Sequence, residues 1–354
     1  MKRVAVIAGD GIGPEVIREA VLTIEAAQPL FDLEITLTSF DWSADKYLAT
    51  GVSMPDGALE MLASEYDAIL TGAFGDPRVK DNKHAADILL GMRFGLDLYI
   101  NLRPIKLIDA RLCPLKDRTA RDVDFVVFRE NTEGLYTFMG GNFKRGTADE
   151  IAIQEEVNTR KGVERIITAA FDYARATGRK RVTMSDKSNV LTYGHDLWQR
   201  VFKEVAARYS DIEANHLYVD VLTMWMALDP ARFDVIVTNN LFGDIITDLG
   251  AALQGGLGMA ASGNIHPGRV SLFEPVHGSA PQFAGKNVAN PVAAILTAAM
   301  LMDYVGYKEA AAAIECAVEA AVRGGETTTD IGGHLSTSEA GEAIRRHLRE
   351  AAER

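Results

Sequence analysis

The feature that most constrains the fold is a repeated alternation between short apolar runs and stretches with helical periodicity. The first run, residues 4–8, is followed by a glycine-rich turn and by a helical pattern from about residue 14 to residue 27. Pro14 suits the first position of that helix. Further strand-like runs lie at 67–70, 99–102, 125–128, 182–184 and 235–237. This alternation predicts an α/β protein with covered sheets.

Length and composition narrow the functional classes. A chain of 354 residues, 47% apolar and 24% charged, predicts two domains and excludes wholesale disorder. The net charge of -12 argues against a nucleic-acid binder. Cys113 and Cys316 are far apart and lack metal-ligand spacing, which disfavours a disulfide framework or a zinc site. The longest apolar stretch, 291–302, is too short to span a bilayer, and the run at 4–8 is too short for a signal peptide. We therefore expect a cytoplasmic protein.

The first glycine-rich turn resembles only part of a dinucleotide-binding fingerprint. Gly9, Gly11 and Gly13 follow the first apolar run, but the third glycine of G-x-G-x-x-G would fall at position 14, which is proline. A standard Rossmann site is therefore disfavoured. The glycines fit a tight strand-to-helix turn.

Three arginines lie near apolar or strand-like segments: Arg93, Arg103 and Arg129. A guanidinium binds a carboxylate through two parallel hydrogen bonds, so converging arginines would form a site for a polycarboxylic acid. Each arginine taken alone is also explained by an ion pair at a strand end. Only their convergence in space would favour the binding site.

Asp244 and Asp248 are four residues apart, so a helix there would place both carboxylates on one face. Like charges repel unless a cation or an arginine lies between them. Oxygen ligands suit Mg²⁺ or Mn²⁺ better than zinc, and Asp220 is a candidate third ligand. A solvated pair of aspartates is the alternative interpretation.

Lys187 and Tyr136 each follow a strand-like run, at the end of α/β strands where ligands usually bind. A lysine surrounded by positive charge would lose its proton more readily and serve as a general base. A surface lysine and a packed tyrosine are the plainer alternatives.

Two further segments stand out. Residues 134–141 and 151–157 predict an extended excursion, which is either an arm that pairs with another subunit or an ordinary surface hairpin. Residues 273–281 (FEPVHGSAP) form a second cluster of small residues, whose backbone N–H groups would suit a pyrophosphate, with His277 near an adenosine.

Taken together, these motifs resemble the β-decarboxylating dehydrogenases, a family that includes 3-isopropylmalate, isocitrate, homoisocitrate and tartrate/D-malate dehydrogenases. The resemblance rests on GDGIGPEV at 9–16, NLRP at 101–104, RENTEGLY at 129–136, SDKSNV at 185–190, NLFGDIITDL at 240–249 and FEPVHGSAP at 273–281. It implies the two-domain isocitrate/isopropylmalate dehydrogenase-like fold, not a standard Rossmann fold. The implied division is a larger domain of residues 1–98 plus 255–354 and an inserted central domain of 99–254 that carries a dimerisation arm.

The resemblance also implies a role for each site residue. The substrate would be bound by Arg93, Arg103, Arg129, Leu89 and Leu90, and Mg²⁺ or Mn²⁺ by Asp220, Asp244 and Asp248. Lys187 would take the proton of the substrate hydroxyl and Tyr136 would protonate the enolate left by loss of CO₂. In family members the counterparts of Lys187 and Asp220 reach the site from the second subunit, which implies a homodimer with shared active sites.

The dinucleotide would be bound by Thr71, Asn189, Glu274, His277, Gly278, Ser279, Ala280, Gln282 and Asn290. NAD-using members carry Asp at position 282 and NADP-using members carry Lys, whereas this chain has Gln. Because no base is present there for a 2′-phosphate, and because residues 330–333 resemble NAD-type members, we expect NAD.

The side group of the substrate would be read by the helix before Arg93. Isocitrate enzymes use Ser and Asn at the positions of Asp87 and Leu89, and no basic residue typical of homoisocitrate enzymes lies at 87–92. Leu89 and Leu90 match the apolar pair of isopropylmalate enzymes, although Ala86 replaces their Glu. The implied reaction is the NAD-dependent oxidation and decarboxylation of 3-isopropylmalate to 4-methyl-2-oxopentanoate in leucine biosynthesis. Another 2-hydroxy acid of the family and a non-catalytic regulatory subunit are the alternatives.

Overall fold

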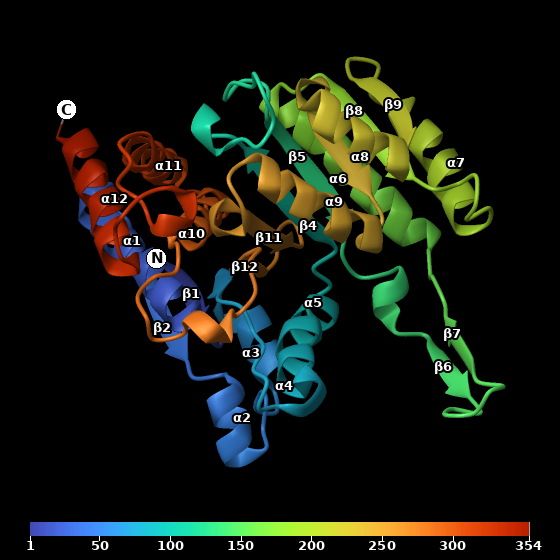
Figure 1. Cartoon of the computed structure of the whole chain (residues 1–354), viewed down its shortest axis with the longest axis horizontal. Coiled ribbons are helices and arrows are strands. Elements are labelled where there is room, and N and C mark those ends of the chain that lie inside the picture. The colour runs from blue at the N-terminus through green and yellow to red at the C-terminus, as the bar shows by residue number, and fades with distance from the viewer. Residues whose placement is uncertain (354) are drawn as a thin grey trace. The chain divides into compact units, whose positions relative to one another are not determined.

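The computed structural model describes residues 1–353, which form two compact units (Figure 1). The first unit contains Met1–Leu98, Lys106–Ala120 and Ala251–Arg354, and the second contains Tyr99–Ile105 and Arg121–Gly250. The division expected from the sequence placed residues 106–120 and 251–254 in the central domain. Ile108 shows why residues 106–120 join the first unit, because its side chain is buried in the core of that unit.

The first unit is built on five strands in the order β2-β1-β3-β12-β11. β1 (Lys2–Ile7) is parallel to β2 (Ile35–Phe40) and to β3 (Ala68–Thr71). β12 (Ser271–Pro275) is parallel to β3 and antiparallel to β11 (Ala261–Ile265). The apolar runs at 4–8 and 67–70 thus lie in strands, as predicted, and the structure pairs these two strands.

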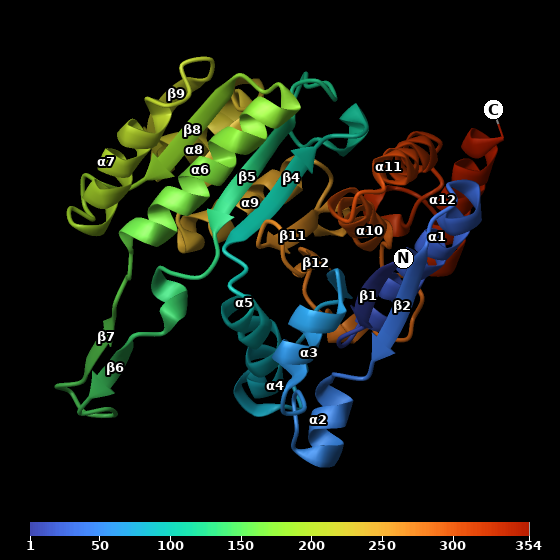
Figure 2. The ribbon, with the colours of Figure 1, turned by 180° about the vertical axis from the view of Figure 1, so that it is seen from behind.

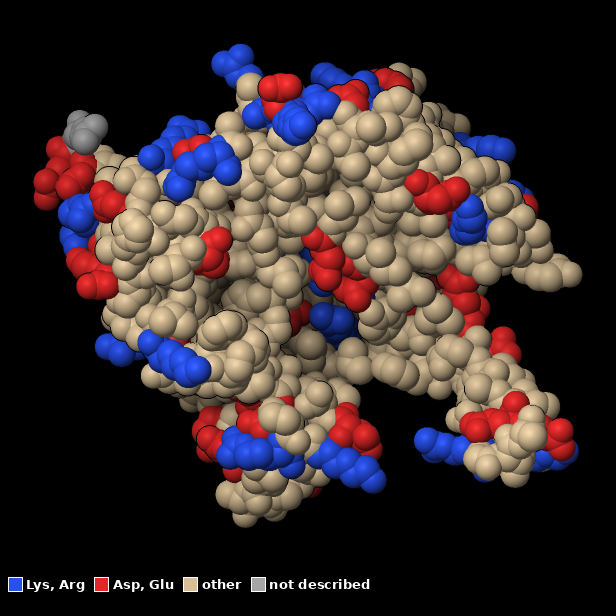
Figure 3. Space-filling view, in the orientation of Figure 1, with Lys and Arg blue, Asp and Glu red and all other residues tan. Residues whose placement is uncertain are grey.

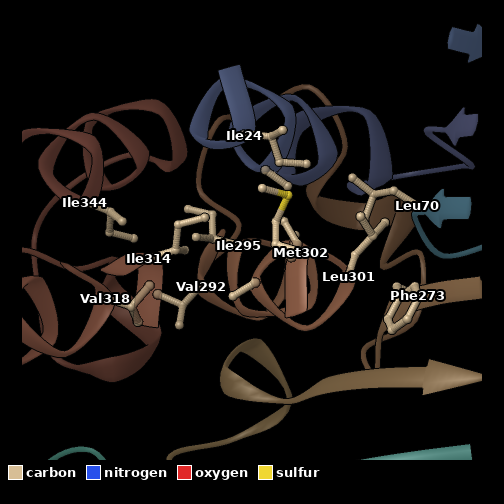
Figure 4. Packing of buried hydrophobic residues seen from close by; sticks show 14 of the residues in the cluster. Ile24, Leu70, Phe273, Val292, Ile295, Leu301, Met302, Ile314, Val318 and Ile344 are labelled. Atoms are coloured by element: carbon tan, nitrogen blue, oxygen red, sulfur yellow. The ribbon is translucent and has the colours of Figure 1, made fainter. Parts of the chain in front are cut away.

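Side chains of β1 alternate between two buried faces. Val4 and Val6 belong to one apolar cluster, and Ala5 and Ile7 belong to another. The first cluster is covered by helices that pack on one another (Figure 4), namely α1 (Gly13–Leu30), α10 (Val292–Tyr304), α11 (Lys308–Arg323) and α12 (Thr337–Ala352). The second cluster includes residues of α3 (Ala58–Glu65). Because both faces are buried, β1 reads as a continuous apolar run rather than an alternating one.

The second unit has the strand order β4-β5-β10-β8-β9. The strands are β4 (Ile100–Lys106), β5 (Asp124–Glu130), β10 (Val235–Thr238), β8 (Arg181–Asp186) and β9 (Glu213–Tyr218). The pairs β5–β10, β10–β8 and β8–β9 are parallel, so the carboxyl ends of these strands lie at one edge of the sheet. That edge is where ligands bind in open α/β sheets.

Helices cover both faces of the strands in the second unit. α6 (Arg160–Thr177) lies over one face with α7 (Gly194–Ala206) beside it, and α8 (Val219–Leu228) and α9 (Asn240–Leu253) lie over the other (Figures 1 and 2). α6 buries one apolar stripe that includes Val163, Ile167 and Phe171. The charged residues of α6 occupy the remainder of the helix, as expected of an amphipathic surface helix.

The predicted excursion forms a two-stranded hairpin that projects from the second unit (Figure 2). β6 (Gly140–Phe143) pairs antiparallel with β7 (Ile151–Gln154), and every residue of both strands is exposed. Large apolar side chains are exposed along the same segment: Phe138, Met139, Phe143, Ile151 and Ile153. An isolated two-stranded hairpin is at best marginally stable in water, so contact with another surface would stabilise this one.

The remaining helical elements are short. They are α2 (Ala44–Thr50), α4 (Lys83–Ala85), α5 (Gly91–Gly95), a π-helical turn η2 (Ala86–Leu90) and short 3₁₀ turns, among them η4 (Leu135–Thr137) and η7 (Pro281–Phe283). No helix within residues 1–353 is both long enough and apolar enough to cross a membrane. On the face shown in Figure 3, basic and acidic side chains are interspersed.

Candidate active site

An arginine and a carboxylate from different elements meet in the second unit. Arg129, in β5, is 1% exposed, and its Nε donates to Asn240 Oδ1 at 2.9 Å. Its Nη1 donates to the carboxylate of Asp244 on α9. Gly243 permits this approach, because a Cβ there would lie 2.5 Å from Arg129 Cγ. β5 and α9 thus hold a buried guanidinium against a carboxylate that remains partly open to solvent.

Arg103 and Tyr136 converge on the same carboxylate. Arg103 Nη1 donates to Thr247 Oγ1 at 2.5 Å, and its Nη2 lies 3.5 Å from Asp244 Oδ1. The Tyr136 hydroxyl donates to Asp244 Oδ2 at 2.7 Å, and the Arg129 guanidinium lies 5.0 Å from the tyrosine ring centroid. The structure therefore brings Arg103, Arg129, Tyr136 and Asp244 into one cluster.

The cluster has a defined protonation pattern. Burial alone would raise the pKa of the Asp244 carboxyl, but the charge of Arg129, the Tyr136 hydrogen bond and the charge of Arg103 hold that pKa below its usual range. Burial raises the pKa of the Tyr136 phenol, and Asp244 adds to this effect against the opposing charge of Arg129. Near neutral pH the cluster thus contains a carboxylate anion and a phenol that keeps its proton.

The other predicted metal ligands are placed differently. Asp248 is exposed one helical turn beyond Asp244 on α9. Asp220, in the first turn of α8, accepts a hydrogen bond from Lys187 Nζ at 2.6 Å. Within residues 1–353, no three His, Cys, Asp or Glu side chains gather as a metal site would require. A single chain therefore does not bring Asp220 together with Asp244 and Asp248.

Lys187 follows β8 and is anchored through its neighbour Asp186. The buried Asp186 carboxylate accepts from Gln199 Nε2 at 2.7 Å and Ser188 N at 3.1 Å, and His216 Nε2 lies 2.8 Å away. These contacts tie the turn after β8 to β9 and α7. Burial alone would raise the pKa of Asp186, but the hydrogen bonds from His216, Ser188 and Gln199 hold it below its usual range.

Asp186→Asn is expected to lower the free energy of unfolding at pH 7 by about 2 kcal/mol, since hydrogen bonds to a charged group are lost. A lowered folded-state pKa contributes stability above the ordinary carboxyl value of 3.8, and this contribution is lost as pH falls through the folded-state pKa. The difference in unfolding free energy between wild type and variant should therefore be constant from pH 7 to pH 5 and should decrease below pH 3.8. Urea unfolding followed by fluorescence checks this, because Trp198 and Trp225 lie in the same unit. A gap unchanged at pH 3.5 would contradict the assignment.

The third predicted arginine belongs to the first unit. Arg93, in α5, is buried, and its Nη2 donates to Glu274 Oε1 at 2.9 Å. Glu274 also accepts from Asn264 Nδ2 at 2.8 Å. Arg93 Nε is buried and has no hydrogen-bond partner among residues 1–353. Glu274 thus orients Arg93 while one of its donors stays available.

Two loops of the first unit interlock beside β12. Ile12 N donates to the carbonyl of Ser279 at 2.8 Å, and a Cβ on Gly11 would lie 1.9 Å from that carbonyl oxygen. Gly11 also has a φ of +60°, which favours glycine. The turn predicted at the first glycine-rich motif is therefore present, and its partner is the His277–Ala280 loop.

His277 is buried in this loop. Its Nδ1 lies 3.0 Å from the carbonyl of Gly278, which assigns the ring proton to Nδ1. Burial lowers the pKa of the imidazole, so the ring is neutral near pH 7. His277 Nε2 is then a buried acceptor without a partner among residues 1–353. A Cβ on Gly278 would meet no atom within 4 Å, which leaves open space beside the loop.

The remaining predicted cofactor residues are dispersed. Asn290 is buried and donates to Asp330 Oδ2 at 3.0 Å, and Thr71 is fully buried at the end of β3. Gln282 is exposed on η7. Asn189 is exposed in the turn after β8, in the second unit. The structure thus groups His277, Gly278 and Ser279 in one loop, whereas Asn189 lies in the other unit.

The family model described as isocitrate/isopropylmalate dehydrogenase matches residues 3–344. The chain belongs to this family.

Individual relatives agree with this assignment. The 3-isopropylmalate dehydrogenase of Thermobifida fusca is 47% identical over 342 residues, which are 94% of this chain and 96% of the relative. That of Mycobacterium tuberculosis (strain H37Rv) is 48% identical over 346 residues, 97% of this chain and 98% of the relative. The crystal structure of isocitrate dehydrogenase from Methylococcus capsulatus has a TM-score of 0.88 at 36% identity, and covers 99% of this chain and 100% of that one.

The family fold predicted from the motifs is thereby confirmed, and the predicted membership is correct. The residues present also fit the groups that the family implies. The unpartnered Nε2 of His277 and the open space at Gly278 suit a nucleotide. Asp244 and Asp248 offer hard oxygen donors of the kind that Mg²⁺ and Mn²⁺ prefer.

The segment before Arg93 was predicted to be a plain helix, and its structure differs. Residues 86–90 form a π-helical turn, which shifts the helical register before Arg93. Asp87 Oδ2 accepts from Ser53 Oγ at 2.8 Å and from Lys83 Nζ at 2.6 Å. Leu89 packs against the second apolar cluster of the first unit, and Leu90 is half-buried. Asp87 is thus held by Lys83 and Ser53.

Gly11→Ala is expected to raise the KM for the dinucleotide by at least about tenfold, equivalent to about 1.4 kcal/mol. The added Cβ would collide with the Ser279 carbonyl and force the two loops apart. Gly51→Ala is the control, because Gly51 has a similar φ of +75° but open space around it. Steady-state kinetics and thermal melting of both variants separate loop displacement from backbone strain. If Gly11→Ala left KM unchanged and both variants lowered the melting temperature equally, the role of this loop in dinucleotide binding would be refuted.

Sequence reasoning missed several residues that build these sites. Asp10 Oδ1 accepts from Ala44 N at 2.7 Å, Oδ2 accepts from Gly75 N at 2.8 Å, and His84 Nε2 lies 2.7 Å from Oδ2. The sequence signal that could have identified Asp10 was its position between two glycines of a turn. Thr247 and Asn240, which hold the arginines, lie inside a quoted motif but carried no signal of their own.

Proposed function

We propose that the chain oxidises and decarboxylates 3-isopropylmalate to 4-methyl-2-oxopentanoate and CO₂ with NAD, as a step of leucine biosynthesis. The supporting observation is the identity of 47–48% over nearly the whole length to relatives named 3-isopropylmalate dehydrogenase. Leu89 and Leu90 carry no hydrogen-bonding side-chain groups, which suits an isopropyl group rather than a third carboxylate.

We assign the substrate carboxylates to Arg103 and Arg129 together with Arg93. Arg129 and Arg103 are already oriented by Asn240 and Thr247, so little side-chain freedom is lost on binding. Arg93 is oriented by Glu274 and keeps its Nε available. A planar guanidinium that is held in place binds a carboxylate through two hydrogen bonds.

Asp244 and Asp248 would hold Mg²⁺ or Mn²⁺, with Asp220 of a second copy completing the set. Such a metal would supply charge that lowers the pKa of the substrate hydroxyl and stabilises the enolate after CO₂ is lost. Within one chain Asp220 instead accepts from Lys187. This pair must open before Lys187 Nζ can hydrogen-bond to the substrate hydroxyl.

Lys187 and Tyr136 would move the two protons of the reaction. Lys187 Nζ would take the proton from the C2 hydroxyl, and bound NAD would supply the acceptor for the hydride of C2. The carboxylate on C3 then leaves as CO₂, and its bonding electrons form the enolate. Tyr136 donates its phenolic proton to C3, a role that suits a phenol whose pKa is raised and which therefore arrives protonated.

The His277–Ala280 loop would bind the adenosine end of NAD, with Thr71, Asn189, Glu274, Gln282 and Asn290 as the further contacts we assign. His277 Nε2 can accept a hydrogen bond from the adenine amino group. Gln282 is neutral, so it offers no charge to the 2′-phosphate of NADP. We therefore propose NAD as the preferred dinucleotide.

We propose a homodimer in which the β6–β7 hairpin contacts the second subunit. Phe138 and Phe143 are 65% and 62% exposed, and both would be buried by such a contact. The dimer would also deliver Lys187 and Asp220 to the partner's site. The two cysteines are free thiols, which suits a reducing, cytoplasmic location.

Turnover of the purified chain tests the function directly. With 3-isopropylmalate, NAD and Mn²⁺, absorbance of NADH should rise together with one equivalent of 4-methyl-2-oxopentanoate, and EDTA should stop both. Absence of turnover under these conditions would refute the proposal and favour the alternative of a non-catalytic regulatory subunit.

A further inference from the structure

A buried histidine lies behind Lys187 and is not used by the chemistry described above. His195 stands in the first turn of α7 and is fully buried. Its Nδ1 accepts a hydrogen bond of 2.7 Å from the backbone N–H of Lys187. Its Nε2 lies 3.2 Å from Glu156 Oε1. The imidazole therefore bridges the segment before α6 and the turn that carries Lys187.

The contacts around His195 select one tautomer. Because Nδ1 accepts from Lys187, the ring proton lies on Nε2 and points to Glu156. Asn239 Nδ2 donates to the same Glu156 oxygen at 2.8 Å, and the Phe242 ring meets the imidazole edge to face at 5.6 Å. Burial alone would raise the pKa of Glu156, but the hydrogen bonds from His195 and Asn239 hold it below its usual range.

Four neighbours among the described residues contact the imidazole ring. Glu156 is the charged group that faces it, and the other neighbours are the Lys187 backbone, Asn239 and Phe242. A side chain with one donor and one acceptor, both engaged, has a single orientation. The geometry thus fixes the position of the Lys187 backbone nitrogen relative to α7.

Lys187 begins a tight turn, in which its carbonyl accepts from Val190 N at 3.0 Å and from Leu191 N at 2.9 Å. Its backbone N–H donates to His195 Nδ1. A shift of the backbone would be carried along the side chain to Nζ, and misplacement of a catalytic group by about 1 Å can cost about 10²-fold in rate.

We propose that His195, oriented by Glu156, is a positioning residue that sets the direction from which Lys187 approaches the substrate hydroxyl. The proposal rests on the function proposed above, in which Lys187 is the general base. It makes His195 part of the catalytic apparatus without contact to substrate, and it assigns the essential role to the Nδ1 acceptor rather than to the bulk of the ring.

Two substitutions separate these roles. In His195→Asn the side-chain oxygen can occupy the place of Nδ1 and still accept from Lys187 N. In His195→Gln the amide reaches the place of Nε2 and can still contact Glu156, but the acceptor for Lys187 is lost. Both variants remove part of the ring, so both should lower the melting temperature by similar amounts.

We expect His195→Gln to lower kcat by about 10- to 100-fold with KM values changed less than about threefold. His195→Asn should keep kcat within about threefold of wild type. Glu156→Ala should lower kcat in the same direction as His195→Gln, because the ring loses its orientation. Equal kcat values in the Asn and Gln variants would overturn the proposal. So would decreases in kcat that follow the decrease in melting temperature alone.

A readout independent of activity distinguishes this proposal from the function on which it rests. In protein labelled with ¹⁵N-lysine, the Lys187 amide proton should resonate downfield in wild type and His195→Asn and move upfield in His195→Gln, with Lys187→Arg providing the assignment. An unshifted resonance in His195→Gln would refute the positioning bond even if the enzyme is active. A shifted resonance without turnover in wild type would instead refute only the function.

Discussion

Lys187→Met is expected to lower kcat by about 10²- to 10⁴-fold while the KM for NAD stays close to wild type. This is the range that a positioned proton-transfer group contributes. Methionine keeps the length and much of the apolar stem of lysine but cannot accept a proton. The measurement is initial-rate kinetics with 3-isopropylmalate under saturating NAD and Mn²⁺.

Lys187→Arg sharpens this test, because arginine keeps the positive charge and the possible pair with Asp220 but holds its proton at any accessible pH. It should be nearly as inactive as Lys187→Met. Lys161→Met, at an exposed position of α6, should leave kcat unchanged. If Lys187→Arg retained wild-type kcat, the charge of Lys187 rather than proton transfer would be its contribution, and the general-base assignment would fail.

Asp244→Asn should lower kcat/KM by more than about 10²-fold and raise the Mn²⁺ concentration needed for half-maximal activity. Changes to groups that merely support a metal ligand cost about 10- to 100-fold, so loss of a ligand charge should cost more. The variant also leaves the buried Arg129 facing a neutral amide instead of a carboxylate. Titration of Mn²⁺ by calorimetry and by activity measures both effects.

Asp196→Asn is the matched control for Asp244→Asn, because Asp196 is an exposed acid of the same unit that pairs with Arg200 on α7. It should leave both activity and Mn²⁺ affinity at wild-type values. An Asp244→Asn variant that loses activity but binds Mn²⁺ normally would show that Asp244 acts only by orienting Arg129. That result would remove it from the metal site.

The buried strands could be read from the sequence because their pattern is local. Residues 4–8 and 235–237 are apolar throughout, since side chains on both faces of these strands are buried, and the strands form at Lys2–Ile7 and Val235–Thr238. The spacing of Asp244 and Asp248 meant that a helix there would place both carboxylates on one face, and α9 is that helix. The family motifs added the fold, which no periodicity could have provided.

Contacts between distant residues lay beyond a local pattern. Arg129 and Asp244 are 115 positions apart, and their pairing depends on α9 packing beside β5 with glycine at 243. The partner of Asp87 was equally hidden, because Ser53 is 34 positions away. The π-helical turn at 86–90 breaks the period of 3.6 residues on which sequence reading relies, so the facing of Leu89 and Leu90 could not be derived.

Substrate choice distinguishes the proposed activity from that of relatives, because the family includes enzymes named for isopropylmalate and for isocitrate. It is tested most directly by kcat/KM with 3-isopropylmalate, isocitrate, D-malate and tartrate, measured as NADH formation with Mn²⁺ on one preparation. We predict that 3-isopropylmalate is preferred over each of the others by more than about tenfold, equivalent to about 1.4 kcal/mol of transition-state binding. A preference of that size for any other acid would contradict the account.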